Sequence, residues 1–301
     1  MHSNKRLASR LPVILMAAAL LLPLSAAADE HPAWATMAAI NAQLAAQGAD
    51  YQLEVIEFLT TDDSDPEFQR TVFFSDRGNK QLGHDFVPGD ARRTWGSGTA
   101  ITFFLDGVEG VTDDGLTQAQ TDAAIRAGIA AWENLTCSTI PQIDLGNSPF
   151  DAGVVENILG FGGSPFIFAD IAHTGWEPRG LFDAIAPNGG SFILAATFTF
   201  VFTGTDVDNN GKLDTAFREV IYNDGFTWAI NANFDVQTVA THEHGHALSQ
   251  AHFGEAFTNP SGKLFFAPRA VMNAAYSGVQ QSFHGSDVGG HCSNWGSWPN
   301  N

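Results

Sequence analysis

The stretch "THEHGHALSQAH" (residues 241–252) places four histidines and one glutamate within twelve positions of a chain that has ten histidines in 301 residues. The preceding "NFDVQTVA" (233–240) offers Asp235 as the N-cap of a helix that runs into the histidines. On that helix His242 and His246 are four positions apart, so both imidazoles project from the same face. This spacing predicts that the two rings bind one metal ion.

Two further residues complete the predicted site. Glu243 follows His242 directly, which places its carboxylate beside the metal, where a general base is needed to take a proton from water. His252 is ten residues after His242 and becomes a third ligand if the chain turns back after Leu248. Catalytic zinc uses three protein ligands and an open fourth position, where it lowers the pKa of water to about 7. We interpret His244, on another helix face, as a surface histidine or one that supports the site without binding metal.

The pattern HExxHxxGxxH followed by a methionine turn is the signature of the metzincin metalloproteases, and "HEHGHALSQAH" resembles their matrixin branch. The later "AVMNAAY" (270–276) resembles the methionine turn, which implies that Met272 lies under the zinc site and that Tyr276 faces it. "SDVGGHCSNW" (286–295) resembles the closing helix of the family.

The resemblance implies an α/β (α+β) zincin fold, with a twisted mixed sheet, an active-site helix and a C-terminal methionine-turn subdomain. It implies a metzincin-type catalytic domain over residues 94–301. Two features depart from the family pattern. Ser249 stands in place of the usual glycine and could strain a left-handed turn by ~1 kcal/mol without removing a ligand. The segment 253–271 is longer than in compact matrixins, and we expect it to be an elaboration near the substrate.

Peptide substrates of such a fold bind by adding a strand to an exposed sheet edge. The segment 192–203, in which phenylalanine and threonine alternate, is our candidate for that edge strand. A core strand with no substrate contact explains the same pattern equally well.

A second metal motif is "DVDNNGKLD" (206–214), whose oxygen-bearing side chains match the spacing of a calcium-binding loop. The predicted calcium ligands are Asp206, Asp208, Asn210, the Lys212 carbonyl and Asp214. Position twelve is Phe217 instead of glutamate, and Glu219 is a candidate to compensate for it. Asp224 is a weaker candidate ligand in a neighbouring stretch. The alternative is a hairpin loop that binds no ion.

The start of the chain, residues 1–28, has three basic residues, an apolar run over 11–24 and an Ala-Ala-Ala cleavage signature, which together predict a signal peptide. Its removal leaves 11 Lys and Arg against 33 Asp and Glu, a net charge of −22. This charge argues against nucleic-acid binding, because phosphate would be repelled. We expect a secreted monomer, extracellular or periplasmic, with no stable membrane span after cleavage.

Residues 29–93 form an N-terminal region that is either a propeptide, with Arg92-Arg93 as a processing point, or a structural extension. Within it, 35–47 has a helical pattern and 51–61 alternates like a strand. It contains no cysteine, so the cysteine-switch latency of matrixin propeptides is absent.

Later segments predict strands at 100–107 and 167–172 and a helix that begins at a Thr117-x-x-Gln120 capping box, with Ile125, Ile129 and Trp132 on one face. Strands and helices mixed in this order indicate an α/β or α+β sheet covered by helices. Cys137 and Cys292 are the only cysteines, and export favours a disulfide between them over two separate buried thiols.

The resulting hypothesis is a zinc-dependent endopeptidase that cleaves protein or peptide substrates, with His242, His246 and His252 as zinc ligands, Glu243 as general base and calcium as a second cofactor. One rival is an inactive zincin fold used as a calcium-stabilised extracellular binding protein, although an intact Glu243 argues against it. A second rival is a zinc-storage or structural metal protein, whose site would be fully coordinated.

Overall fold

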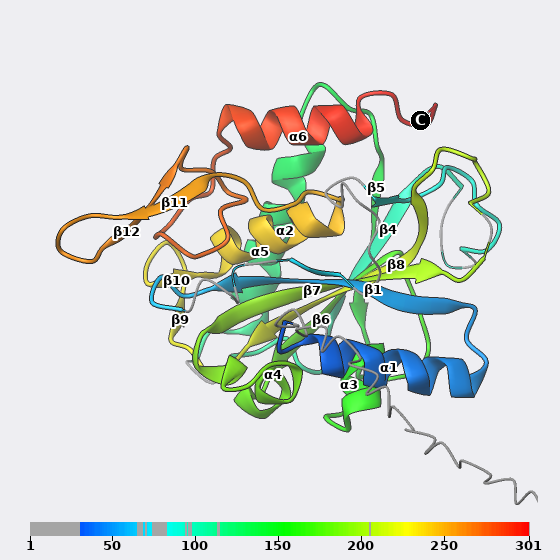
Figure 1. The fold of residues 1–301 in the computed structure, drawn as a ribbon, viewed down its shortest axis with the longest axis horizontal. Helices are drawn as coiled ribbons and strands as arrows, with labels where there is room; N and C mark the ends of the chain where they lie inside the picture. The colour runs from blue at the N-terminus through cyan, green and yellow to red at the C-terminus, as the bar shows by residue number, and fades with distance from the viewer. Residues whose placement is uncertain are drawn as a thin grey trace, which may run out of the picture. The chain divides into compact units, whose positions relative to one another are not determined.

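The fold is a mixed sheet with helices on both faces, seen in a computed structural model (Figure 1). The structure describes residues 31–64, 69, 71–73, 83–93, 95, 98–112, 115–204 and 206–300. The predicted signal peptide, residues 1–28, lies outside the described residues. Residues 31–301 form one compact unit.

Eight strands make up the main sheet, in the order β2-β1-β7-β8-β6-β4-β5, with β3 also paired to β8. Their bounds are β1 Tyr51–Thr60, β2 Val72–Phe73, β3 His84–Asp85, β4 Ile101–Asp106, β5 Gln142–Ser148, β6 Ile171–Glu177, β7 Ile193–Phe202 and β8 Leu213–Asn223. Strands β5, β4, β6 and β8 run parallel to one another, whereas β7 is antiparallel to both β8 and β1. A mixed α/β sheet, as the sequence predicted, is therefore present.

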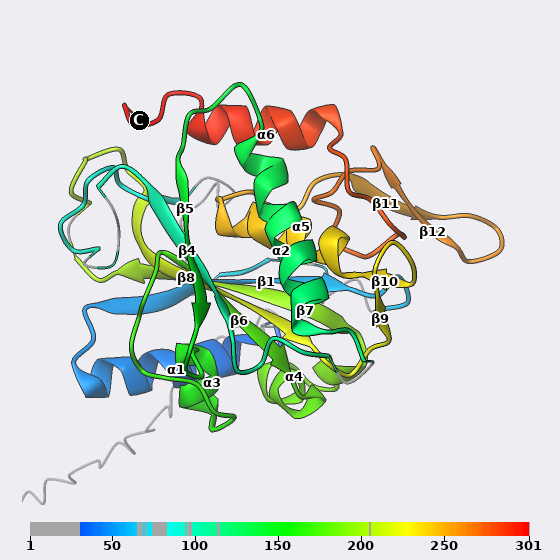
Figure 2. The ribbon, with the colours of Figure 1, turned by 180° about the vertical axis from the view of Figure 1, so that it is seen from behind.

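The helices form one layer on each face of the sheet, as both views show (Figures 1 and 2). One layer holds α2 (Gln118–Glu133), α5 (Val236–Ala247) and α6 (Gly285–Trp295); the other holds α1 (Trp34–Gln47), α3 (Val154–Leu159) and α4 (Arg179–Ile185). Each layer buries its own hydrophobic core against the sheet. The remaining short elements are the 3-10 turn Gly189–Ser191, β9 Trp228–Ala229 paired with β10 Phe234–Asp235, and the hairpin β11 Glu255–Thr258 with β12 Leu264–Ala267. No described helix combines the length and the apolar character needed to cross a membrane.

Two of the predicted helix starts are confirmed. Asp235 caps α5, since its Oδ2 accepts the backbone N–H of Thr238 at 2.9 Å. Thr117 caps α2, where its backbone N–H donates to Gln120 Oε1 at 2.9 Å. Each cap satisfies groups that a helix end leaves unpaired. Both helices are thereby fixed where they cross, with the Trp132 indole N–H of α2 donating to the Thr241 carbonyl of α5 at 2.7 Å.

The prediction that residues 192–203 form an exposed edge strand is wrong. β7 covers residues 193–202 as predicted, but it lies inside the sheet, between β8 and β1, and all ten of its residues are buried. The strand that covers it is β1, from the N-terminal region, and the pairing spans Tyr51 opposite Phe202 to Thr60 opposite Ile193. Leu53, Ile56 and Phe58 of β1 are fully buried. The sequence could not show this pairing, because 130 to 150 residues separate the partners.

From His31 onward, the N-terminal region belongs to the same compact unit as the residues that follow it. Helix α1 buries Met37, Ile40 and Leu44 in the core that it shares with β1 and β7. At the predicted processing point, Arg93 is buried and its Nη1 donates to Asp170 Oδ1 at 2.7 Å. Arg93 is therefore held inside the folded chain, whereas the Arg92 side chain is partly exposed, and the described part of residues 29–93 adds β1, β2 and β3 to the sheet.

The C-terminal part surrounds the end of α5. The segment 253–271 contains the β11–β12 hairpin, which projects from the body (Figure 1), so an elaboration is present there. Helix α6 contains Cys292, which forms the expected disulfide with Cys137 beyond the end of α2. This covalent link closes a loop with a sequence separation of 155 residues and ties α6 to the first helix of its layer.

Candidate metal centre

Three histidine rings converge beneath β1. The Nε2 atom of His246 lies 2.9 Å from Nε2 of His242 and 3.2 Å from Nε2 of His252. Helix α5 supplies the first two rings on one face, and the turn after Leu248 brings back the third, as the spacing predicted. Four-coordinate zinc with bonds of about 2.0–2.1 Å to nitrogen requires its ligand atoms to lie roughly 3.3 Å apart. The separations in the structure therefore suit one small metal ion.

The protonation of the rings follows from their other nitrogen atoms. His242 Nδ1 lies 2.7 Å from the Val271 carbonyl oxygen, and His246 Nδ1 lies 2.8 Å from that of Gln250. A carbonyl only accepts hydrogen bonds, so both Nδ1 atoms carry the proton and both Nε2 atoms present lone pairs. Lone pairs 2.9 Å apart repel each other unless a cation lies between them. The donor set thus fits zinc, and this carbonyl support is typical of metal-binding histidines.

Burial keeps these rings neutral. Burial lowers the pKa of His246 to about 3. Burial, followed by the neighbouring histidines, also lowers the pKa values of His242 and His252 well below their usual range. A neutral imidazole is the form that binds a metal.

Glu243 lies beside the triad and is fully buried. Its Oε2 accepts the hydroxyl hydrogen of Thr197 on β7 at 2.6 Å, whereas Oε1 has no hydrogen-bond partner among the described residues. Burial raises its pKa to about 8, an effect that the Thr197 hydrogen bond opposes. The carboxyl group can therefore exchange a proton close to neutral pH.

The turn that returns His252 adopts the strained conformation expected for Ser249, with φ of 61°. Its hydroxyl accepts a hydrogen bond from Arg218 Nη2 at 2.7 Å. Arg218 is fully buried on β8, and its Nη1 donates to the carbonyls of His246 and Ala247 at the end of α5. A cation at a helix C-terminus stabilises the unpaired carbonyls. Serine thus replaces glycine here with a side-chain anchor, which the sequence pattern did not reveal.

The methionine turn lies against α5. A Cβ atom on Gly245 would meet Met272 Sδ at 2.4 Å, so this sulfur fills the space between the two ligand-bearing turns of the helix. The backbone N–H groups of Val271 and Met272 donate to Asp287 of α6, at 3.0 and 3.1 Å. The closing helix therefore fixes the turn whose Val271 carbonyl orients His242.

Tyr276 lies near His242, but its hydroxyl is used elsewhere. It donates to the Asn233 carbonyl at 2.6 Å and accepts the Asp235 N–H at 3.0 Å. Its ring therefore buttresses the start of α5, and its oxygen is not directed at the three Nε2 atoms.

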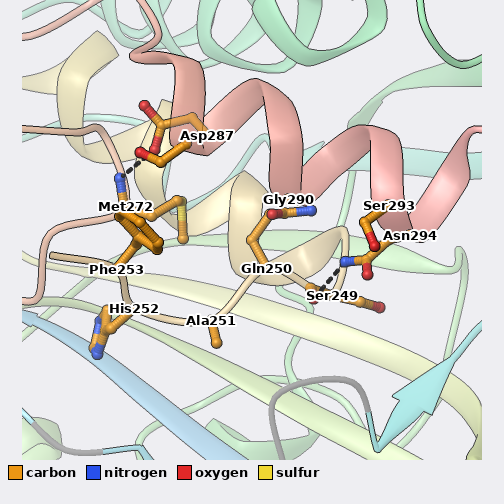
Figure 3. Close-up of a pocket in the computed structure, with 11 residues that line it drawn as sticks. Ser249, Gln250, Ala251, His252, Phe253, Met272, Asp287, Gly290, Ser293 and Asn294 are labelled. Carbon is orange, nitrogen blue, oxygen red and sulfur yellow. Dashed lines mark hydrogen bonds between the residues drawn. The ribbon is translucent and has the colours of Figure 1, made fainter. Parts of the chain in front are cut away.

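A pocket of about 230 Å³ lies between the turn after α5 and helix α6 (Figure 3). It is lined by Gln250, Phe253, Met272 and Asn294 among others. His252 also lines this pocket, so the pocket reaches one of the three converging histidines (Figure 3).

The predicted calcium loop is brought together in part. One oxygen each from Asp206, Asp208 and Asp214 lies within 4.8 Å of the others. Gly211 makes the expected bend, with φ of 83°. The Asp214 carboxylate is, however, in contact with the Arg92 guanidinium. Asn210 uses its side-chain amide to donate to Asp208 Oδ2 at 3.0 Å, which holds the loop closed.

Lys212, whose backbone carbonyl is a predicted ligand, directs its side-chain Nζ to Asp85 in an ion pair at 2.6 Å. Glu219 does not compensate for Phe217, because its carboxylate accepts the Val154 and Val155 N–H groups at the start of α3, at 2.6 and 3.0 Å. Asp224 belongs to none of the three ligand clusters found among the described residues.

His244 is buried and points away from the triad, so it is not a surface histidine. Its Nε2 lies 2.6 Å from Gln142 Oε1, its Nδ1 lies 3.2 Å from His173 Nε2, and His173 Nδ1 lies 2.8 Å from the Tyr222 hydroxyl. Each of these three hydrogen bonds needs one proton, and all three form when both imidazole rings are neutral. His173 is thus a core histidine with both ring nitrogens hydrogen-bonded.

Three residues at the centre were missed by sequence reasoning: Thr197, Arg218 and Glu57. Glu57 Oε2 lies 3.0 Å from His246 Nδ1. No local motif marks any of them, since each comes from a strand far from the histidines in sequence.

No family model matches this chain, and no curated protein matches it.

The His173–His244 pair predicts acid sensitivity. Burial, followed by the Arg126 charge, lowers the pKa of His173 to about 3. The unfolded chain binds protons at these rings below about pH 6.5, and the folded chain does not. The free energy of unfolding should therefore fall as pH falls from about 6.5 towards 3, by up to about 1.4 kcal/mol per pH unit for each ring. Urea unfolding of the zinc-loaded protein across this range measures the slope.

In the His173→Gln variant one of these titrating rings is gone. The free energy of unfolding of this variant should change with pH less steeply than that of the parent, by about 1 kcal/mol per pH unit. Parallel slopes for parent and variant would show that His173 binds its proton equally well in both states.

Proposed function

We propose that this chain is a secreted zinc-dependent endopeptidase that cleaves extended protein segments. The observation that carries the proposal is the convergence of three Nε2 atoms, with the Nδ1 atoms of His242 and His246 each bonded to a backbone carbonyl. Glu243 stands beside this point with one carboxylate oxygen unpartnered among the described residues. The metzincin resemblance of the sequence supports the same reading.

The site residues divide the chemistry among them. His242, His246 and His252 would hold zinc, which supplies a Lewis acid that makes water nucleophilic near neutral pH. Glu243 takes a proton from the attacking water at its carboxylate and gives it to the leaving amine. Thr197 orients that carboxylate through its 2.6 Å hydrogen bond. Met272 and Asp287 keep the ligand-bearing helix in place from the other side.

The contacts at the end of β1 suggest the class of substrate. β1 runs antiparallel to β7 and then forms a parallel bridge, Thr60 with Ala275, just after the methionine turn. The Thr60 carbonyl accepts the Tyr276 N–H at 2.7 Å. Leu59 lines a cavity of about 10 Å³ together with His242 and Tyr276. An extended segment is therefore held between a strand and a turn in the manner of a bound peptide.

From this arrangement we infer that residues 57–60 occupy the place of a substrate and that peptides are cleaved when they displace this part of β1. The cavity at Leu59 would then accept an apolar side chain. Leu53 and Ile56 pack in the core beneath α1, and so does Phe58. Displacement of residues 57–60 must therefore also remove the Phe58 ring from that core.

Loosening that end should increase activity. Leu59→Ala removes the side chain beside His242 and weakens the hold on β1, since buried Leu→Ala substitutions cost about 2–5 kcal/mol. Cleavage of an added peptide library should rise at least tenfold, because about 1.4 kcal/mol favouring the displaced form multiplies its population by ten. The rate per zinc-loaded chain is measured by mass spectrometry of the products.

The matched control is Leu53→Ala, the same substitution on the same strand at the end away from the histidines. It should lose comparable stability without a rise in cleavage. Equal rates in the two variants would contradict the assignment of residues 57–60 to the substrate position.

The role of Glu243 is tested with Glu243→Gln, in the parent and in the Leu59→Ala background. We expect cleavage to fall by about 10²–10⁴, the usual contribution of a general base, while zinc stays near one per chain. Glu219→Gln, which alters a buried glutamate bonded to the start of α3, should retain cleavage. Unchanged turnover in Glu243→Gln would contradict its role as general base, whereas no zinc-dependent cleavage in any form would favour the non-catalytic binding protein instead.

A further inference from the structure

A cluster of four carboxylates lies at the carboxyl-terminal ends of β4, β5 and β6, away from the histidines. Glu109 follows β4, Asp151 follows β5, Glu156 lies in α3 and Glu177 ends β6. One oxygen each from Glu109, Asp151 and Glu156 lies within 4.8 Å of the others. Glu177 is an electrostatic neighbour of this group, because its charge raises the pKa of Glu156 and Glu109 raises the pKa of Glu177. Figure 2 shows α3 close to the ends of these strands.

These carboxylates are buried without partners. Glu156 is 1 % exposed and Glu177 is 0 % exposed. Neither oxygen of Glu156 or of Glu177 has a hydrogen-bond partner among the described residues, and neither does Glu109 Oε2 or Asp151 Oδ1. Burying an ionised carboxylate with no partner costs several kcal/mol at least. Something other than the described side chains must therefore compensate this charge.

Backbone hydrogen bonds and two glycines allow the carboxylates to lie close together. Asp106 accepts the N–H groups of Glu109 and Ala152, at 2.9 and 2.8 Å, and so joins the two loops that carry Glu109 and Asp151. Gly153, with φ of 147°, leaves room for Glu156, since a Cβ there would lie 2.4 Å from Glu156 Oε2. Gly175 allows Glu109 to approach β6 in the same way. Any larger residue at these glycines would close the space that the carboxylates face.

No basic side chain neutralises the cluster. In the part of the chain that the structure describes, no ion pair joins a lysine, arginine or histidine to any of the four carboxylates. Burial, followed by the Glu177 charge, raises the pKa of Glu156 well above its usual value. Burial and the neighbouring Glu109 raise that of Glu177 to about 10. Without a cation, the cluster must take up protons to fold.

We propose that Glu109, Asp151, Glu156 and Glu177 bind a calcium ion. Calcium takes six to eight oxygen ligands in flexible geometry, and carboxylates from several segments suit it well. Magnesium requires a near-ideal octahedron and usually retains several waters, which a buried site of unevenly placed carboxylates fits poorly. The bound ion joins the loop after β4, the loop before α3 and the end of β6, and so fastens one end of the parallel strands.

This site is separate from the predicted calcium loop, and its test does not depend on proteolytic activity. Asp206–Asp214 precede or begin β8, whereas Glu177 pairs with Asn223 at the other end of that strand. Variants at one site therefore leave the other intact. The isosteric variants Glu156→Gln and Glu177→Gln remove charge and keep the side-chain shape, and Asp206→Asn with Asp208→Asn is the matched control in the loop.

The experiment measures thermal unfolding and calorimetric binding of calcium, using the full zinc-loaded chain. Millimolar calcium should raise the melting temperature of the parent by several degrees and release protons at pH 7. In Glu156→Gln and Glu177→Gln we expect calcium affinity at this site to fall at least tenfold. In a calcium chelator both variants should melt higher than the parent, because a glutamine, unlike the buried glutamate, does not have to take up a proton on folding. The loop variant should keep the calcium-dependent rise and the proton release.

A second readout is terbium luminescence excited through tryptophan, since Trp176 directly precedes Glu177. Calcium should displace terbium from the parent, and the signal should be lost in Glu177→Gln. Calcium binding with unchanged stoichiometry, affinity and proton release in both glutamine variants would overturn the proposal. A calcium-dependent rise that disappears only in the loop variant would overturn it as well.

Discussion

The mutual repulsion of two imidazole lone pairs, those of His242 and His246, is the constraint on which the centre of this structure depends. Two Nε2 atoms 2.9 Å apart, with no proton available between them, are stable only around a positive charge. The carbonyls of Val271 and Gln250 create this situation, because each one claims the proton of a ring. The site is therefore arranged for a cation by the backbone of two separate turns as much as by the histidines themselves.

Holding those turns requires the rest of the C-terminal half. Arg218 crosses from β8 to the end of α5 and also holds the Ser249 hydroxyl, so the sheet fixes the point at which the chain reverses towards His252. Asp287 of α6 holds the methionine turn, and the Cys137–Cys292 disulfide holds α6. Each link is an interaction between segments distant in sequence. The geometry of the histidines is thus a property of the whole layer of helices.

The sequence predicted what local periodicity and short spacing can encode. The i, i+4 histidines, the Asp235 cap, the return of His252 and the left-handed turn at Ser249 were all predicted, because each depends on neighbours within ten residues or so. The position of β7 was not, because whether a strand is an edge depends on which distant strand pairs with it. The prediction that Glu219 is a calcium ligand was wrong for a similar reason, because its carboxylate bonds to the start of α3. The four-carboxylate cluster comes from separate segments between Glu109 and Glu177, and no spacing rule joins them.

Two halves of the protein meet at β1. The strand completes the core beneath α1 with one end and covers the histidines with the other. Glu243 is fully buried, and burial is what raises the pKa of its carboxyl group to about 8. The three Nε2 atoms and the two supporting carbonyls lie outside β1, which contacts the histidines through Glu57, whose Oε2 is 3.0 Å from His246 Nδ1.

X-ray absorption at the zinc edge, on protein purified with zinc, tests the metal centre most directly. We predict one zinc per chain, with three imidazole nitrogens and one further oxygen or nitrogen atom as neighbours at about 2.0–2.1 Å. We also predict that His252→Ala lowers the number of imidazoles to two. A spectrum with sulfur neighbours, with fewer than three imidazoles in the parent, or with no change in His252→Ala would contradict the assignment of the three histidines as the zinc ligands.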